Sequence, residues 1–191
     1  MTRPRIGIIV GSTREGRFAD HPLNWYLDIV KDRDDAEFEV VDLRDYPMPF
    51  FEEKMSPAWV PPENDVARRW GEKLESLDGF VFTVAEYNHS ITGVLKNALD
   101  YAYKEFNRKP ATFLAYGGTG GARAVEQLRL ILAELQVASL KYNVHIGMTE
   151  LLGILREGKT MADFPYLIDG AKAMTDDLVW WTNALKTARA A

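Results

Sequence analysis

Residues 5–18 read RIGIIVGSTREGRF, and this stretch decides the fold class. Its first half, Arg5–Val10, is a short apolar run rich in β-branched residues, which is typical of a strand buried on both faces of a sheet. Gly11 ends the run, and a polar loop follows it. A helix is expected to start near Asp20, with Pro22 in its first turn. A buried strand, a glycine turn and a helix in this order predict the opening of a parallel α/β sheet.

Four more strand candidates alternate with helical patterns along the chain. The strands are expected at Phe38–Leu43, Gly79–Val84, Ala111–Tyr116 and, with a weaker pattern, Tyr142–Ile146. Apolar residues at helical spacing predict helices that carry Val66, Ile91 and Val125, and a final helix from near Phe164 to Leu185. Parallel strands need crossover connections, which place helices on both faces of the sheet. We therefore expect one α/β domain over residues 1–191, a three-layer sandwich whose five-stranded parallel sheet has the order 2-1-3-4-5.

The composition is that of a globular protein. Of the 191 residues, 47% are hydrophobic, and a chain of this length buries a core without a metal or a disulfide. The formal net charge of −5 argues against binding to duplex nucleic acid, which depends on cationic side chains. The apolar runs are far shorter than the roughly 20 residues that span a bilayer, and the N-terminus shows no signal-peptide cleavage site. We expect a cytoplasmic protein that binds neither nucleic acid nor membrane.

The chain contains no cysteine. This excludes thiolate nucleophiles, dithiol redox relays, iron–sulfur clusters and zinc sites built on cysteine. No spacing of His, Asp and Glu suggests a metal site, and no GxSxG segment offers the nucleophile of a Ser-His-Asp triad. His21 and His145 are interpreted as structural or surface residues. Any redox chemistry would therefore have to come from a bound cofactor.

The loop after the first strand, GSTREGRF at 11–18, has the composition of a phosphate-binding turn. Ser12 and Thr13 supply hydroxyl groups, and the amides at the start of the next helix supply further donors. Arg14 and Arg17 can add charge-assisted hydrogen bonds to phosphate oxygens. The loop has neither the GxxxxGK[ST] nor the GxGxxG pattern, so a terminal monophosphate fits it better than a pyrophosphate. An ordinary turn with two solvated arginines is the alternative.

Two more unusual loops follow the third and fourth strands, and the order 2-1-3-4-5 would bring all three loops to one crevice. The loop AEYNHS at 85–90 offers two rings and two polar groups that could frame a flat heteroaromatic ligand: Glu86, Tyr87, Asn88 and His89. The loop YGGTGG at 116–121 lets backbone approach a planar ligand closely. The alternatives are that Tyr87 packs on the sheet edge while Asn88 and Ser90 cap the next helix, and that the glycine loop is a flexible turn.

Taken together, GSTREGR at 11–17, EYNHSITGVLKNALDY at 86–101 and YGGTGG at 116–121 resemble the NADPH-dependent FMN reductase family of flavodoxin-like proteins. That family also includes chromate, azo-dye and quinone reductases, and EYN followed by GxLKNAxD is the most specific part of the match. The resemblance implies a flavodoxin-like fold and bound FMN. Two positions depart from the family pattern: Ala85 stands where Pro is usual, and Arg17 stands where many members have Ser.

The resemblance also implies which residues contact FMN. They are Ser12, Arg14, Arg17 and the backbone near Phe18 for the phosphate, Glu86, Tyr87 and Asn88 for the isoalloxazine, and Gly117, Gly118 and Thr119 for another side of the ring. The implied reaction passes a hydride from NADPH or NADH to the flavin and then electrons to a small acceptor, such as a quinone, an azo compound, a metal ion or free flavin. No catalytic side chain is obligatory for it. A flavodoxin-type electron carrier and a flavodoxin-like interaction module without cofactor are the alternatives.

The aromatic content predicts a homo-oligomer, either a dimer or a tetramer. The chain holds five Trp, eight Tyr and nine Phe, which is more than the predicted core needs. Six of them lie outside the core pattern, in the Pro-rich stretch 44–63 or near the end of the helix that carries Ile91: Phe50, Phe51, Trp59, Tyr101, Tyr103 and Phe106. Members of the family commonly dimerise with residues of one subunit beside the flavin of the other. The alternative is that the Pro-rich stretch buries these rings against its own domain.

Overall fold

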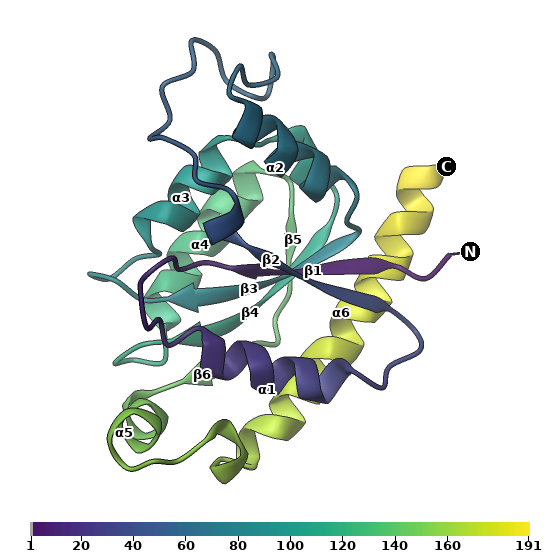
Figure 1. The fold of residues 1–191 in the computed structure, drawn as a ribbon. Helices are drawn as coiled ribbons and strands as arrows, with labels where there is room; N and C mark the ends of the chain where they lie inside the picture. The colour runs from purple at the N-terminus through teal and green to yellow at the C-terminus, as the bar shows by residue number, and fades with distance from the viewer. Residues whose placement is uncertain (1) are drawn as a thin grey trace.

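The computed structural model describes residues 2–191 and shows one parallel sheet between two layers of helices (Figure 1). The strands are β1 (Arg5–Val10), β2 (Glu37–Asp42), β3 (Gly79–Ala85), β4 (Pro110–Tyr116), β5 (Ala138–Ser139) and β6 (Val144–Ile146). They pair in the order β2-β1-β3-β4-β5, with β6 also paired to β4, and every pair is parallel. The predicted flavodoxin-like sheet order is confirmed.

The fifth position of the sheet differs from its prediction, because two short strands share it. β5 pairs with Pro110 and Ala111, and β6 pairs with Leu114–Tyr116 farther along β4. Between them the chain leaves the sheet, and the Thr112 hydroxyl donates a hydrogen bond to the carbonyl of Tyr142. The predicted strand from Tyr142 therefore starts too early and misses β5.

Six helices connect and cover the strands. They are α1 (Asp20–Val30), α2 (Asp65–Glu75), α3 (Gly93–Asp100), α4 (Ala122–Glu134), α5 (Met148–Arg156) and α6 (Tyr166–Ala190), with short 3-10 helices η1 (Leu43–Asp45), η2 (Lys104–Phe106) and η3 (Met161–Asp163). In Figure 1, α2, α3 and α4 lie on one face of the sheet, and α1 and α6 lie on the other. The sequence did not predict α5, and α6 runs past the predicted end at Leu185. No helix within residues 2–191 combines the length and apolarity that a bilayer crossing demands.

Each face of the sheet has its own core. Trp70, Phe82 and Leu99 belong to the core under α2, α3 and α4, whereas Tyr26 and Met174 belong to the core under α1 and α6. This division is what the alternation of side chains along a strand requires when both faces of a sheet are covered.

Two of the aromatic residues predicted outside the core lie inside it. Tyr101 and Phe106 are fully buried, and the Phe106 ring lies 5.2 Å from that of Phe80 between centroids. The reason is η2, which folds back against α2 and carries Phe106 under Trp70. Tyr103 packs against the same core and is partly buried. The prediction is wrong for these positions because α3 ends at Asp100 and the chain then turns inward.

The Pro-rich stretch keeps its own aromatic residues at the surface. Phe50 is 84% exposed and Trp59 is 74% exposed, whereas Phe51 is less exposed and packs against Tyr101. The Asn97 side chain in α3 fixes this stretch, since it donates to the Pro49 carbonyl at 2.7 Å and accepts from the Phe51 amide at 2.9 Å. The segment is therefore docked on α3 through Pro49 and Phe51, and it leaves two large rings uncovered.

A buried lysine lies at the amino end of β4. Lys109 donates from Nζ to the carbonyls of Leu74 at 2.8 Å and Glu75 at 3.3 Å, at the end of α2. Burial lowers the pKa of its ammonium group to about 8. The unfolded chain then binds more protons than the folded one between that pH and the ordinary lysine pKa near 10.5.

This difference predicts that the protein becomes more stable as the pH rises above about 8. From pH about 7.5 to about 9.5 the gain from this group should be about 2 kcal/mol in the free energy of unfolding, and it should vanish in Lys109→Met. Urea unfolding of both proteins at the two pH values measures it. An equal pH dependence in the two proteins would contradict the assignment to Lys109.

Candidate functional site

Three loops meet at the carboxyl edge of the sheet because β1, β3 and β4 are adjacent and parallel. Val10 pairs with Thr83, and Ala85 pairs with Tyr116, so the loops that follow these strands leave the same edge (Figure 1). They are the phosphate loop at 11–18, the EYN loop at 86–90 and the glycine loop at 117–121. The convergence expected from the strand order is present, at the place where open α/β sheets bind ligands.

Gly11 fixes the start of the phosphate loop. Its amide donates to the Thr83 hydroxyl at 3.1 Å, and its carbonyl accepts from the Thr92 hydroxyl at 2.5 Å. A Cβ at this position would lie 2.5 Å from the carbonyl oxygen of Thr83, so only glycine fits. Thr92 also caps α3, because its hydroxyl accepts from the Leu95 amide. The loop is therefore tied both to β3 and to the helix that follows the EYN loop.

The phosphate loop presents unused donors. The main-chain amides of residues 13–16 and of Phe18 donate no hydrogen bond to any other residue in the part of the chain that the structure describes. Ser12 is buried with its hydroxyl 3.4 Å from that of Tyr87, and the exposed Arg14 guanidinium lies 5.8 Å from the centre of the Tyr87 ring. A row of free amides beside a hydroxyl and a cation is the donor set that a terminal phosphate requires.

Arg17 reaches the loop, but its guanidinium faces other protein groups. It is 5% exposed and forms ion pairs with Asp20 at 2.7 Å and Asp42 at 2.5 Å. It also donates to the Ser12 carbonyl at 2.8 Å. These contacts hold its pKa above the ordinary arginine value, chiefly through the hydrogen bond to Asp42. Asp42 was not predicted as a partner of Arg17, because it lies at the end of β2, 25 residues away in the sequence.

The EYN loop is a tight turn. Tyr87 and Ser90 exchange two main-chain hydrogen bonds of 2.9 and 3.1 Å, and Asn88 and His89 between them have positive φ angles of 49° and 75°. Asn tolerates this left-handed geometry better than most residues, and both side chains are exposed. The idea that Asn88 caps the next helix is wrong, because Thr92 occupies that position. Asn88 is free to contact a ligand.

Glu86 joins the EYN loop to the glycine loop. Its carboxylate, 3% exposed, accepts from the Thr119 hydroxyl at 3.2 Å and from the Arg123 guanidinium and amide at the start of α4. Burial raises its pKa, but the hydrogen bonds from Arg123 and Thr119 outweigh this effect and lower it below the usual range. Glu86 therefore stays ionised at neutral pH and holds two loops of the site together.

Close contact with the end of β4 determines the conformation of the glycine loop. Gly121 has a φ of 71°, and a Cβ there would lie 2.7 Å from the amide nitrogen of Tyr116. Gly118 and Thr119 are exposed at the tip. The methyl group of Met148, half-exposed at the start of α5, lies 3.4 Å from the position of a Cβ on Gly118. Met148 was not predicted as a neighbour of this loop, because α5 itself was not predicted.

The rings of Phe18, in the phosphate loop, and Tyr116, just before the glycine loop, pack against each other. Their ring centroids are 5.1 Å apart, and Tyr116 is almost fully buried. Burial raises the pKa of the Tyr116 hydroxyl above its ordinary value. Both rings therefore present an uncharged surface beside the free amides of the loop.

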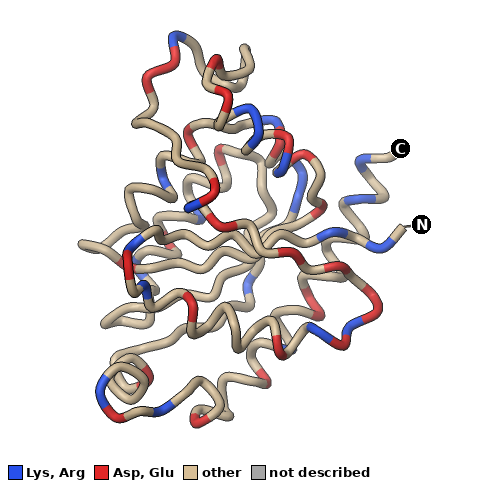
Figure 2. The backbone as a smooth tube through the Cα atoms, in the orientation of Figure 1, with Lys and Arg blue, Asp and Glu red and all other residues tan. Residues whose placement is uncertain are grey.

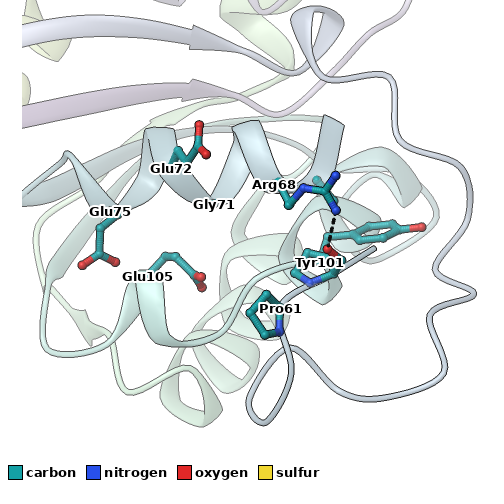
Figure 3. A pocket seen from close by; sticks show the side chains of 9 residues that line it. Pro61, Arg68, Gly71, Glu72, Glu75, Tyr101 and Glu105 are labelled. Atoms are coloured by element: carbon teal, nitrogen blue, oxygen red, sulfur yellow. Dashed lines mark hydrogen bonds between the residues drawn. The ribbon is translucent and has the colours of Figure 1, made fainter. Parts of the chain in front are cut away.

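A separate cavity of about 290 Å³ lies between α2, η2 and the Pro-rich stretch (Figure 3). Three carboxylates line it, those of Glu72, Glu75 and Glu105, and its one arginine, Arg68, donates to the Pro62 carbonyl. This excess of negative charge repels a phosphate, so the cavity does not compete for a phosphorylated ligand. Charge alone does not single out a face, because basic and acidic residues alternate over most of the chain (Figure 2).

The donor set of the three loops suits FMN and does not suit a metal. Within residues 2–191, no cluster of three or more His, Asp or Glu side chains could hold a metal ion. The loops do offer free amides and Arg14 for a phosphate, the Tyr87 ring and Asn88 amide for a flat heteroaromatic group, and an exposed glycine backbone on another side. Such a combination is typical of a flavodoxin-like nucleotide site.

Comparisons with known proteins agree with this fold. The sequence profile described as NADPH-dependent FMN reductase matches residues 4–150. An NAD(P)H-dependent FMN reductase of a Nectria species is 36% identical over 130 residues, which cover 65% of each protein. An NAD(P)H:quinone oxidoreductase of Solanum tuberosum is 36% identical over 132 residues, which cover 66% of each. The flavoenzyme FerB of Paracoccus denitrificans, an NAD(P)H:(acceptor) oxidoreductase, superposes with a TM-score of 0.71 at 19% identity over 95% of this chain and 98% of its own.

The molecule is thus a flavodoxin-like α/β protein whose three loops meet at the carboxyl edge of the sheet. The chain belongs to the NADPH-dependent FMN reductase family, a family of flavin-dependent oxidoreductases. The predictions of the family, of an enzyme and of FMN with NAD(P)H as its cofactors are confirmed at this level. The individual contact residues, the acceptor, the oligomeric state and the compartment stay predictions.

Proposed function

We propose that this protein is an FMN-dependent NAD(P)H oxidoreductase that reduces small acceptors, with a quinone or free flavin as the first candidates. The observation that carries this proposal is the convergence of the three loops, with free amides, Arg14 and Tyr87, in a member of the FMN reductase family. Relatives named quinone oxidoreductase and flavin reductase support these acceptor classes. Azo compounds and metal ions are further candidates, and the proposed compartment is the cytoplasm.

Each loop has one task in this proposal. The amides of residues 13–16 and Phe18 and the Arg14 side chain hold the phosphate, with the Ser12 hydroxyl at the end of the row. Tyr87 and Asn88 lie along the ring, and the backbone of Gly117, Gly118 and Thr119 borders its other side. The chemistry that bound FMN supplies is hydride transfer from NAD(P)H and electron transfer to the acceptor. The protein binds and orients, and no side chain is assigned a catalytic proton.

Turnover kinetics test the proposed function. The purified chain with FMN should oxidise NADPH or NADH in the presence of a quinone, with parallel double-reciprocal lines, because one open site serves both substrates in turn. Excess quinone should inhibit turnover. A protein that binds FMN but oxidises neither NADPH nor NADH would instead be a flavodoxin-type carrier, and a protein that binds no FMN would be an interaction module.

Removal of the Arg14 side chain should weaken FMN more than riboflavin. Arg14→Ala should cost roughly 1.5–3 kcal/mol of FMN binding, which is the usual value of a hydrogen bond to a charged group, and should leave riboflavin unchanged. Fluorescence titration of the flavin-free protein measures both. Arg68→Ala, an exposed arginine on α2, is the matched control. Equal losses for the two flavins would refute the phosphate role of this loop.

We also propose a homodimer formed through the Pro-rich stretch. Phe50 and Trp59 of this stretch are 84% and 74% exposed, and soluble monomers rarely expose large apolar patches. Sedimentation equilibrium at low micromolar concentration should show at least a dimer that dissociates in the double variant Phe50→Ser, Trp59→Ser. Trp180→Ser removes a ring that is 64% exposed on α6 and should leave the dimer intact. A wild-type monomer with full activity would be the opposite result.

A further inference from the structure

The carbonyl oxygens of the phosphate loop face two arginine side chains. Arg17 donates from Nη1 to the carbonyl of Ser12 at 2.8 Å. Arg44, in η1 just after β2, donates from Nε to the carbonyl of Thr13 at 3.5 Å and from Nη2 to that of Arg14. Three successive carbonyls of the loop are therefore held by arginines.

This arrangement fixes the direction of the amides. A trans peptide is planar, so its N–H points away from its own carbonyl oxygen, and the chain has no cis peptide among residues 2–191. The carbonyls of Ser12, Thr13 and Arg14 share their peptides with the amides of the next residues, 13, 14 and 15. Because the arginines hold the carbonyls, these three amides point to the opposite side, and they donate to no other residue of the described chain.

Asp42 anchors both arginines. Its Oδ1 accepts from Arg17 Nη1 at 2.7 Å and from the Arg44 amide at 3.0 Å, and its Oδ2 accepts from Arg17 Nη2 at 2.5 Å. Asp42 is the last residue of β2 and pairs in register with Val10 of β1. Asp42 is therefore part of the sheet, and its contacts fix the phosphate loop relative to β2.

Arg17 has little left to offer a phosphate. A guanidinium has five N–H groups, and four of those of Arg17 already donate to Asp20, Asp42 and the Ser12 carbonyl. Two carboxylates surround its single positive charge, and its side chain is almost fully buried. Arg14, by contrast, is exposed and forms no ion pair within residues 2–191.

We infer that Arg17 and Arg44, anchored by Asp42, are positioning residues that aim the amides of residues 13–15 at the phosphate, while Arg14 is the cation that contacts it. The inference rests on the proposed FMN site, and it revises the prediction that Arg17 itself binds the phosphate. Arg17, which stands where many family members have Ser, thus holds the carbonyl side of the loop.

Asp42→Asn distinguishes direct phosphate binding by Arg17 from positioning of the loop by Arg17, because the two roles predict opposite changes in FMN affinity. If Arg17 bound the phosphate directly, removal of the competing carboxylate would release the guanidinium and strengthen FMN binding. If Arg17 positions the loop, the same change frees the carbonyls and should weaken FMN binding about tenfold, the equivalent of one hydrogen bond, with riboflavin unchanged. Titration of the flavin-free full chain with each flavin measures the two constants.

Arg17→Lys and Arg44→Gln provide independent tests. A lysine keeps the positive charge but lacks the planar guanidinium that contacts Asp20, Asp42 and the Ser12 carbonyl together. Arg17→Lys should therefore bind FMN more weakly than the wild type does. Arg44 is exposed, so its replacement does not disturb the core, and it should weaken FMN and not riboflavin. Arg33→Gln is the matched control, because Arg33 also bridges two carboxylates, Asp35 and Asp176, far from the loop.

Backbone NMR order parameters give a readout without any flavin. In Asp42→Asn and Arg44→Gln the order parameters of residues 12–18 should fall below those of the wild type, while those of β1 and β3 should not change. Unchanged FMN binding and unchanged order parameters in both variants, or tighter FMN binding in Asp42→Asn, would overturn the inference. Failure of the wild type to bind FMN would overturn the proposed function instead.

Discussion

The site depends on the parallel pairing of β1 with β3. Because the chain crosses from β2 past β1 to β3, the loops after β1 and β3 leave the sheet side by side, and Val10 stands in register with Thr83. The Gly11 amide bonds to Thr83, and the Gly11 carbonyl bonds to Thr92 at the cap of α3. Any side chain at position 11 would push these strands apart. The positions of the phosphate loop and the EYN loop both follow from this contact.

Within that frame, many of the polar side chains serve the loops and not the ligand. Arg17 and Asp42 fix the phosphate loop to β2, and Glu86 and Arg123 fix the EYN loop to α4. Both ion pairs contain one side chain that is at most 5% exposed. The groups left for a ligand are mostly backbone amides, which are already oriented before the ligand arrives. Oriented amides lose little entropy on binding, which favours a cofactor held through many weak contacts.

Much of the fold could be predicted from the sequence. The long strands β1, β3 and β4 are apolar runs closed by glycine or polar residues, and their pattern is unambiguous. β5 could not be found, because two residues, Ala138 and Ser139, show no periodicity. α5 was missed because Gly153 interrupts its apolar pattern, although Glu150, whose side chain accepts from the Gly147 amide at 2.8 Å, marks its start.

The loops of the site were also visible in the sequence, but the partners of their side chains were not. Asp42 is 25 residues from Arg17, and Arg123 is 37 residues from Glu86. These pairings arise only once the strand order is set, and no local pattern encodes them. A sequence therefore shows that Arg17 lies in the loop, whereas the structure shows which way its guanidinium points.

The central claim is that the three loops together bind FMN, with the phosphate on the amides of the first. Amide NMR spectra of the isotope-labelled protein, titrated separately with FMN and riboflavin, test it most directly. With FMN, the shifted signals should come from residues 11–18, 86–90 and 117–121, and with riboflavin the first group should stay in place. Identical patterns for the two flavins, or shifts gathered around the cavity beside α2, would contradict the account.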